Sequence, residues 1–221
     1  MMGQHLLVFF QLGLISLSGL LISLSRQASP SSTRKVMDAG TLPRFRWLIL
    51  SALGISLASF MLNAAPLPLP GWATWASLLL LIAGLALRWA AVRQLGNAFT
   101  TKIAFLQGQL LHTNGVFAYI RHPSYAGLLL YDLGLGLAMS DLISILALTL
   151  LPALAVYQRI AVEERALSQH FGPSYARYKA ATGALFPNLK RALNAQPDQQ
   201  EGECNVQANP CDEHNGPLPK R

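Results

Sequence analysis

Long apolar runs separated by short polar stretches make up most of the chain. A transmembrane helix needs about 20 mostly apolar residues to cross a hydrocarbon core about 30 Å thick. The fourth run is brief, and it is joined to the fifth only by Ser140 and Asp141, so this pair is predicted to form a helical hairpin. The fold class predicted is an all-α integral membrane protein with about five transmembrane helices, at residues 5–25, 47–65, 72–92, 125–140 and 142–160.

Lysine and arginine residues predict the orientation of these helices, because cytoplasmic loops carry an excess of positive charge. Residues 26–46 contain five basic residues and residues 93–121 contain three, whereas the loop at 66–71 and the hairpin tip contain none. We therefore expect the N-terminus outside and the C-terminus in the cytoplasm, in a bacterial inner membrane because no eukaryotic targeting signal is recognisable. A cleaved signal peptide is the alternative for residues 5–25, but no basic segment precedes this run and its apolar stretch is longer than usual.

The composition supports a membrane protein. Hydrophobic residues make up 52% of the chain and charged residues 12%, and the mean hydropathy is +0.35. Soluble domains carry about 25% charged residues, so the composition argues against a disordered protein or an ordinary cytosolic domain. The net charge of +7 is explained by the topology and by attraction to anionic lipid. No nucleic-acid partner is therefore expected.

Three regions follow one another along the chain. Residues 1–71 are predicted to hold the first two transmembrane helices, and residues 72–193 the other three and a cytoplasmic helix. Residues 194–221 form a polar tail that cannot bury enough apolar surface to fold, so we expect it to be disordered. Cys204 and Cys211 lie in this tail, and two cysteines without further ligands are a weak zinc signal, so no metal site is expected.

Arg121, His122 and Pro123 form a polar cluster at the predicted start of the fourth helix. Proline suits the first turn of a helix, and the residue before it is held in extended geometry, so His122 should cap the helix and project away from its axis. The free N–H groups of that turn would favour an anionic ligand group. The alternative is structural: Arg121 reaches lipid phosphate, and His-Pro only begins the helix.

A second cluster lies at the end of the fifth run, where Arg159 and Glu163 share one helix face. Glu163 and Glu164 place two anions beside a negative membrane surface, which invites a cationic partner, although a helix leaving the membrane gains charges in any case. Asp132 in the fourth run is expected to bond to Thr149 or to a neighbouring helix, with a polar cavity as the alternative. Gly134 and Gly136 are expected to allow close helix packing.

In order and spacing, these clusters resemble the isoprenylcysteine carboxyl methyltransferases, and the related phospholipid methyltransferases share much of the same pattern. The resemblance covers about residues 88–187. The matching motifs are LGNAFT at 95–100, GQLLHTNGVF at 108–117, RHPSYAG at 121–127, and then Arg159, Glu163, Glu164, Phe171, Gly172, Tyr175 and Tyr178.

The resemblance implies a cytoplasmic S-adenosylmethionine pocket beside a tunnel that opens to the membrane interior. Arg159 matches the substrate-side arginine of the family. Gln109 stands where the family commonly has histidine, and Phe117 where it commonly has tyrosine. Carried over by position, the cofactor contacts are Gln109, Leu110, Leu111, His112, Phe117, His122, Pro123, Ser124, Tyr125 and Glu163.

Methyl transfer from a sulfonium requires positioning and electrostatic stabilisation more than proton transfer. An acceptor carboxylate needs only a cation such as Arg159 to orient it, whereas an amine acceptor needs a base such as Glu164 or His122. Glu163 would bind the amino group of the cofactor. We therefore expect an S-adenosylmethionine-dependent enzyme that methylates the carboxylate of an isoprenylcysteine-like or other amphiphilic or lipidated substrate.

Other functions remain open at this point. Within the same reaction class, the alternatives are a phospholipid or amine N-methyltransferase and a thiol S-methyltransferase. A small membrane scaffold or transporter component is the non-enzyme alternative, but it gives no reason to place His122, Arg159 and Glu163 at one membrane level. Sterol reductases resemble the same C-terminal architecture but have more spans. No obligate protein partner is evident.

Overall fold

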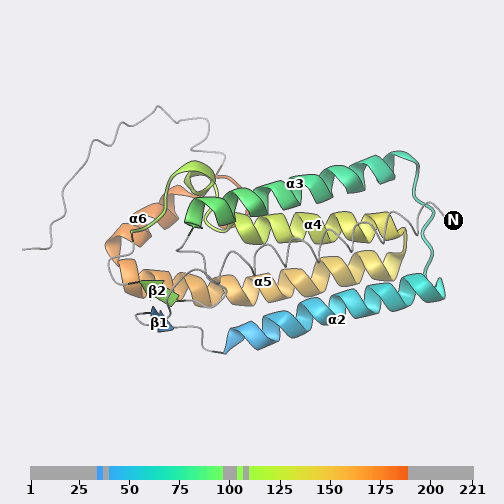
Figure 1. Cartoon of the computed structure of the whole chain (residues 1–221), viewed down its shortest axis with the longest axis horizontal. Helices are drawn as coiled ribbons and strands as arrows, with labels where there is room; N and C mark the ends of the chain where they lie inside the picture. Colours follow the sequence, from blue (N-terminus) through green and yellow to red (C-terminus); the bar gives the residue numbers. More distant parts are fainter. Residues whose placement is uncertain (1–33, 37–39, 97–103, 107–109, 189–221) are drawn as a thin grey trace, which may run out of the picture.

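The computed structural model describes residues 34–36, 40–96, 104–106 and 110–188. Within these residues, four long helices form the body of the molecule and a short helix lies at one end of it (Figure 1). The predicted first run, residues 5–25, and the predicted tail, residues 194–221, lie outside the described residues. The helices are α2 (Thr41–Leu62), α3 (Trp72–Leu95), α4 (Pro123–Met139), α5 (Leu142–Phe171) and α6 (Pro173–Ala181).

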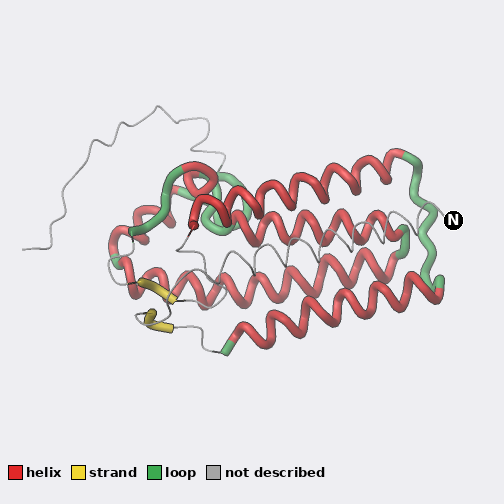
Figure 2. Tube along the Cα trace, in the orientation of Figure 1, coloured by secondary structure: helices red, strands yellow, loops and turns green. Residues whose placement is uncertain are grey.

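The long helices lie side by side, and neighbours run in opposite directions (Figure 1). α4 packs between α3 and α5, and α5 also packs against α2 (Figure 2). As a result, the start of α2, the end of α3, the start of α4 and the end of α5 lie at the same end of the bundle, together with α6. We call this the α6 end.

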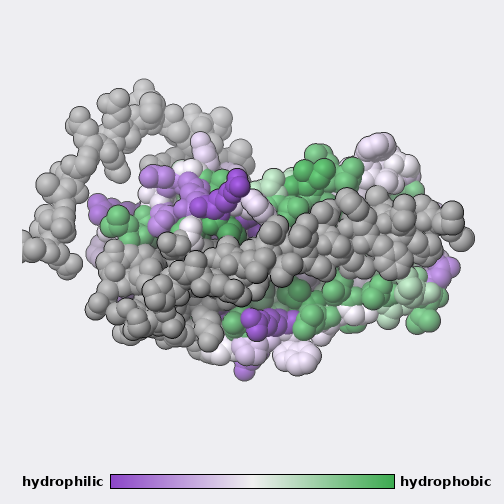
Figure 3. Space-filling model, in the orientation of Figure 1, coloured by the Kyte–Doolittle hydropathy of each residue, from purple (hydrophilic) through white to green (hydrophobic). Residues whose placement is uncertain are grey.

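Three of the described helices, α2, α3 and α5, are long and apolar enough to cross a membrane. α4 has 17 residues, which is about 26 Å at 1.5 Å per residue and less than the hydrocarbon thickness. Large apolar side chains point outward, among them Trp75 at 74% and Leu79 at 68% exposure. Figure 3 shows apolar residues over the helical body and many of the hydrophilic ones near the α6 end. The protein is an integral membrane protein, and five spans remain a prediction.

The predicted hairpin between α4 and α5 is confirmed. α4 ends at Met139, Ser140 adopts a left-handed conformation with φ of 52°, and Asp141 caps α5. The Asp141 carboxylate accepts a hydrogen bond from the backbone N–H of Ser144 at 2.8 Å, which satisfies a free donor of the first helical turn. α5 continues past its predicted end at Ile160 to Phe171, so its last turns extend beyond the apolar run.

Close packing at the predicted glycines is also confirmed. A Cβ atom on Gly134 would lie 2.9 Å from the Ser77 carbonyl oxygen on α3. One on Gly136 would lie 2.9 Å from the Ile145 Cα atom on α5. The glycines therefore allow the α4 backbone to approach both of its neighbours.

Of the two partners expected for Asp132, Thr149 is wrong and a residue of a neighbouring helix is confirmed. Asp132 is buried, at 6% exposure, and its Oδ2 atom and the Thr149 hydroxyl oxygen have no hydrogen-bond partner among the described residues. The Asp132 carboxylate instead interacts electrostatically with the guanidinium of Arg88 on α3. The partner therefore lies on the other neighbouring helix, because a charged side chain inside a bundle is stabilised more by an opposite charge than by a hydroxyl.

A small antiparallel sheet departs from the predicted all-α fold. β1 (Arg34–Val36) pairs with β2 (Ala104–Leu106), with Lys35 opposite Phe105. The sheet joins the segment before α2 to the segment after α3. Each strand has only three residues, too few for an alternating pattern to stand out in the sequence. The other named element is a short 3₁₀ helix, η2 (Gly115–Ala118).

Candidate active site

The two polar clusters of the sequence meet at the α6 end of the bundle. His122 is the N-cap residue of α4 and Pro123 is its first residue, as predicted. Arg159 and Glu163 lie in the last turns of α5. The antiparallel hairpin brings these segments together, so the Tyr125 hydroxyl donates a hydrogen bond to Glu163 Oε2 at 2.9 Å across 38 positions of sequence.

His122 lies inside the cluster, with a side chain only 3% exposed. Its ring stacks on that of Tyr125, with centroids 5.8 Å apart. Nδ1 lies 4.0 Å from Glu163 Oε2, and Nε2 lies 3.5 Å from Glu164 Oε1. Nε2 nevertheless has no partner with hydrogen-bond geometry among the described residues. His122 therefore projects from the helix end as predicted, toward both glutamates.

Arg159 is buried, at 3% exposure, beside the same tyrosine. Its Nη1 atom donates a hydrogen bond to the Thr41 hydroxyl at 2.5 Å. Its guanidinium also lies within interaction range of the Tyr125 hydroxyl. Arg159 and Glu163 thus face one tyrosine, as their shared helix face predicts. Thr41 belongs to a helix turn that hydropathy did not single out.

Glu164 forms the ion-pair centre of this end. Its Oε1 atom accepts from Arg121 Nε at 3.0 Å and Nη2 at 2.9 Å, and its Oε2 atom lies 2.6 Å from Lys179 Nζ. The cationic partner that two adjacent glutamates invite is therefore supplied by the chain itself. The Arg121 side chain is only 9% exposed, so the alternative in which it reaches lipid phosphate is wrong.

Residues at the end of α6 and just after it hold the start of α4 from the other side. The backbone N–H groups of Arg121 and His122 donate to the carbonyl oxygens of Gly183 and Ala184 at 2.9 and 3.0 Å. The Arg121 guanidinium also donates to the carbonyl oxygens of Lys179 and Thr182. The sequence offered no signal for these backbone contacts, because they depend on where α6 returns in space.

Two tyrosines of α6 stay protonated in this environment. Burial raises the pKa of Tyr178 to about 12, and the opposing effect of the Arg121 charge is smaller. Burial, with the charge of Glu164 adding to it, also raises the pKa of Tyr175. The neutral Tyr178 hydroxyl donates to the carbonyl oxygen of Phe117 at 2.7 Å, so α6 anchors η2.

The remaining predicted site residues, at positions 109–112 and 117, make fewer contacts with the cluster. Phe117 is buried at 7% exposure, whereas Leu110 is 80% exposed and points outward. His112 Nδ1 lies 3.2 Å from the Leu110 carbonyl oxygen. Leu111 lies between them, and Gln109 is outside the described residues. The contacts predicted for residues 109–112 therefore remain predictions.

The cluster fits a polar ligand. His122 Nε2 and the Tyr175 hydroxyl oxygen are buried without a partner among the described residues, and buried polar atoms normally find one. The Glu163 side chain, 30% exposed, keeps its carboxylate accessible. A ligand with both a positive and a negative group could therefore bind at the start of α4 and the end of α5.

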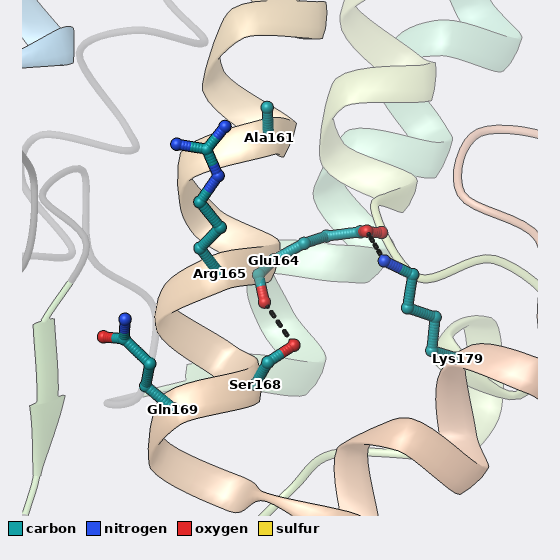
Figure 4. Close-up of a pocket in the computed structure, with 6 residues that line it drawn as sticks. All are labelled: Ala161, Glu164, Arg165, Ser168, Gln169 and Lys179. Carbon is teal, nitrogen blue, oxygen red and sulfur yellow. Dashed lines mark hydrogen bonds and ion pairs between the residues drawn. The ribbon is translucent and has the colours of Figure 1, made fainter.

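A cavity of about 450 Å³ opens next to this cluster, between α5 and α6 (Figure 4). Lys179 reaches across from α6 to Glu164, whereas Arg165 and Gln169 point away from that ion pair. His122 and Tyr125 do not line the cavity, although Glu164, which lies 3.5 Å from His122, does. The sequence did not indicate this cavity. Its lining residues are Ala161, Glu164, Arg165, Ser168, Gln169 and Lys179.

Similarity to known proteins agrees with this arrangement. Residues 77–169 match the family model described as the isoprenylcysteine carboxyl methyltransferase family. The protein-S-isoprenylcysteine O-methyltransferase of Schizosaccharomyces pombe is 36% identical over 106 residues, which cover 47% of this chain and 45% of that protein. Protein-S-isoprenylcysteine O-methyltransferase A of Arabidopsis thaliana is 34% identical over 121 residues, which cover 53% and 61%. The chain thus spans about half the length of these relatives.

A solved structure shows the same relationship in three dimensions. The eukaryotic intramembrane Ras methyltransferase, an isoprenylcysteine carboxyl methyltransferase, is 26% identical and superposes with a TM-score of 0.54. The match covers 67% of this chain and 53% of that one. Sequence family, relatives and fold agree. We conclude that residues 77–169 are similar in sequence to the isoprenylcysteine carboxyl methyltransferase family, and that the fold of the chain is similar to that of a solved isoprenylcysteine carboxyl methyltransferase.

Proposed function

We propose that this protein is an S-adenosylmethionine-dependent membrane methyltransferase that methylates the carboxylate of an isoprenylcysteine-like or other amphiphilic substrate. The observation that carries this proposal is the convergence of Arg159, Tyr125, Glu163 and His122 at the α6 end. The similarity of residues 77–169 to the isoprenylcysteine carboxyl methyltransferase family supports the same reaction class.

Arg159 is suited to hold the acceptor. A carboxylate is already ionised near neutral pH, so it needs no base, and a guanidinium binds it through a planar fork of donors. Bound S-adenosylmethionine would supply a methyl group on a positively charged sulfonium. Water would stabilise the positive sulfonium and the negative carboxylate before they react. A buried arginine at a water-poor membrane edge would orient the acceptor where this stabilisation is smallest, which favours the transfer. The role of Arg159 as the residue that holds the acceptor is part of this proposal.

Residues opposite Arg159 are suited to hold the cofactor. Glu163 offers an accessible carboxylate for an amino group. At the start of α4, the backbone N–H of Ser124 is available to a carboxylate, whereas Pro123 has no N–H and the N–H of Tyr125 donates to the His122 carbonyl oxygen at 3.1 Å. His122 Nε2 supplies a further buried polar atom without a partner among the described residues. Leu110, Leu111, His112, Phe117 and Gln109 complete the proposed set by their match to the family.

An amine acceptor is less well supported. It must lose a proton before it accepts a methyl group, and the carboxylate of Glu164 is held by Arg121 and Lys179. The buried charge of Arg159 would also repel an ammonium headgroup. Of the two bases considered, only His122 keeps an atom without a hydrogen-bond partner among the described residues, and its side chain is only 3% exposed. A thiol acceptor stays an alternative that the product chemistry distinguishes.

The substrate is proposed to enter from the membrane with its tail among the helices and its head at the α6 end. The basic residues of the sequence favour a cytoplasmic location for this end, and we propose a bacterial inner membrane. A lipidated protein or peptide fits such a route. The scaffold or transporter alternative predicts no cofactor binding at all.

The test uses the full-length protein in membranes with methyl-labelled S-adenosylmethionine and an S-prenylated cysteine. A carboxyl methyl ester releases volatile labelled methanol in mild base, which is the expected result. Base-stable label would indicate amine or thiol methylation and overturn the carboxylate assignment. Arg159→Lys should abolish most labelling, while Arg165→Lys, on the exposed face of the same helix, should leave it unchanged. If the wild-type protein shows no labelling and also binds no cofactor, the enzyme proposal is overturned.

A further inference from the structure

The first turn of α2 contacts the candidate site, although it lies outside the segment that matches the family. The Thr41 hydroxyl accepts a hydrogen bond from Arg159 Nη1 at 2.5 Å, across 118 positions of sequence. One helical turn later, the ring of Phe45 lies 6.2 Å from the ring of Tyr125, centroid to centroid. Residues one turn apart share a helix face. This face of α2 therefore meets Arg159 and Tyr125 together.

We propose that the first two turns of α2 form the acceptor-side wall of the site, in which Thr41 is a positioning residue for Arg159 and Phe45 limits the space beside Tyr125. This inference rests on the proposed function, because it takes Arg159 to be the residue that orients the acceptor.

Thr41 can set the direction of the guanidinium. Arginine has a long side chain with many rotamers, and its planar fork is useful only when the plane is fixed relative to the reacting groups. A hydroxyl that accepts from one Nη atom, together with the Tyr125 hydroxyl on a different helix, constrains that plane. Because methyl transfer depends on alignment, a small rotation of the held acceptor lowers the rate.

The contact is not needed to hold α2 against α5. The opposite end of this helix pair is joined by hydrogen bonds from the Ser59 hydroxyl to Asp141 Oδ1 at 2.8 Å and from the Ser144 hydroxyl to the Ser56 carbonyl oxygen at 3.0 Å. α2 and α5 also pack extensively along their lengths. A purely structural role for Thr41 would therefore be redundant, whereas a positioning role would not.

Phe45 adds a reason to assign specificity to these turns. Its partly buried ring borders Tyr125, which in turn binds Glu163. Since α2 lies outside residues 77–169, the shared segment would supply the cofactor side and these turns would adapt the site to a particular acceptor head.

The test measures steady-state kinetics of the full-length protein with an S-prenylated cysteine as acceptor. Thr41→Val keeps the shape but removes the hydrogen-bond acceptor, and we expect kcat/KM for the acceptor to fall about tenfold. Thr41→Ser keeps the hydroxyl and should restore most of the wild-type value. The KM for S-adenosylmethionine and the thermal melting temperature should stay unchanged in both. Thr74→Val, at an exposed position of α3, is the matched control.

Phe45→Ala should raise the ratio of kcat/KM for a prenylated peptide to that for a prenylated cysteine several-fold, because the wall recedes. An unchanged ratio would overturn the specificity role. A lower melting temperature in Thr41→Val with unchanged acceptor kinetics would mean that the contact is only structural. An equal fall in kcat/KM for the acceptor and for S-adenosylmethionine would overturn the assignment of Thr41 to the acceptor side. A wild type that binds S-adenosylmethionine but methylates no acceptor would overturn the proposed function and, with it, this inference.

Discussion

Arg121 binds Glu164 through two nitrogen atoms on one carboxylate oxygen, at 3.0 and 2.9 Å, although 43 positions separate the residues. With Lys179 on the other oxygen at 2.6 Å, this contact joins the start of α4, the end of α5 and α6. Glu163, its neighbour in sequence, accepts from Tyr125 and remains partly exposed. Two adjacent glutamates thus have different surroundings, and we expect them to differ in function.

Glu164→Gln should lower the free energy of unfolding, because the charge that holds two cations is lost. Hydrogen bonds to charged groups contribute about 1–3 kcal/mol, so the melting temperature in detergent should fall by several degrees. Glu163→Gln should leave the melting temperature nearly unchanged and weaken binding of S-adenosylhomocysteine about tenfold. Calorimetric titration and thermal melts measure the two effects. Equal loss of binding in both variants, with no difference in stability, would contradict the separate roles.

Asp141 is the most heavily bonded carboxylate at the opposite end of the bundle. It is 2% exposed and accepts from the Ser59 hydroxyl, the backbone N–H groups of Ala65 and Ser144, and the Ser144 hydroxyl. Asp141→Ala leaves these donors without their acceptor, so the free energy of unfolding should fall by about 3 kcal/mol or more. Ser59→Ala removes one hydrogen bond and should cost about 1 kcal/mol. Chemical denaturation in detergent checks the order, and a larger loss in Ser59→Ala would contradict it.

The Asp141 carboxylate should make the stability of the protein depend on pH in the acidic range. Burial alone would raise the pKa of Asp141, but the hydrogen bonds from Ser144, Ser59 and Ala65 outweigh it, so the pKa is lowered. A lowered pKa contributes stability that is fully present above the unfolded value of 3.8 and is lost as the pH falls through the folded value. The melting temperature of the wild type should therefore fall more steeply below about pH 4 than that of Asp141→Asn. If the melting temperatures of the wild type and Asp141→Asn fall in parallel as the pH is lowered, Asp141 does not contribute to the pH dependence of stability.

Gly127 should tolerate no side chain. A Cβ atom there would lie 2.5 Å from the Gly84 carbonyl oxygen and 2.9 Å from the Arg88 nitrogen, both backbone atoms of α3. Gly127→Ala must push α3 and α4 apart, so we expect a loss of about 1–3 kcal/mol in the free energy of unfolding. Gly54 of α2 has no atom within 4 Å of the equivalent position, and Gly54→Ala should be neutral or slightly stabilising. Thermal melts of Gly127→Ala and Gly54→Ala measure the two effects. An equal melting temperature in both variants would contradict a steric contact at Gly127.

The sequence by itself determined the local features. Long apolar runs predict helices because a backbone in lipid must satisfy its own hydrogen bonds, and the runs at 47–65, 72–92 and 142–160 each lie largely in a helix of the structure. Ser140 and Asp141 predict the hairpin, and His122 and Pro123 the start of α4, because caps and turns depend on neighbouring residues. The motifs that resemble the family also predict which clusters should meet.

The ends of the helices were less predictable. α2 begins at Thr41 and α5 continues to Phe171, both beyond the apolar runs. Hydropathy marks the part of a helix that lies in lipid and does not register polar turns that extend past it. The site was therefore predicted without the α2 turn that holds Arg159.

Only the tertiary structure decided which side chains pair. Arg121 and Lys179 bind Glu164 rather than Glu163, Asp132 faces Arg88 rather than forming a bond with Thr149, and Thr41 binds Arg159. Such partners depend on the rotation of each helix about its axis and on the reach of long side chains, neither of which is fixed by spacing along the chain. The sequence thus determined the helices and the clusters, and packing determined the contacts that the proposed chemistry would use.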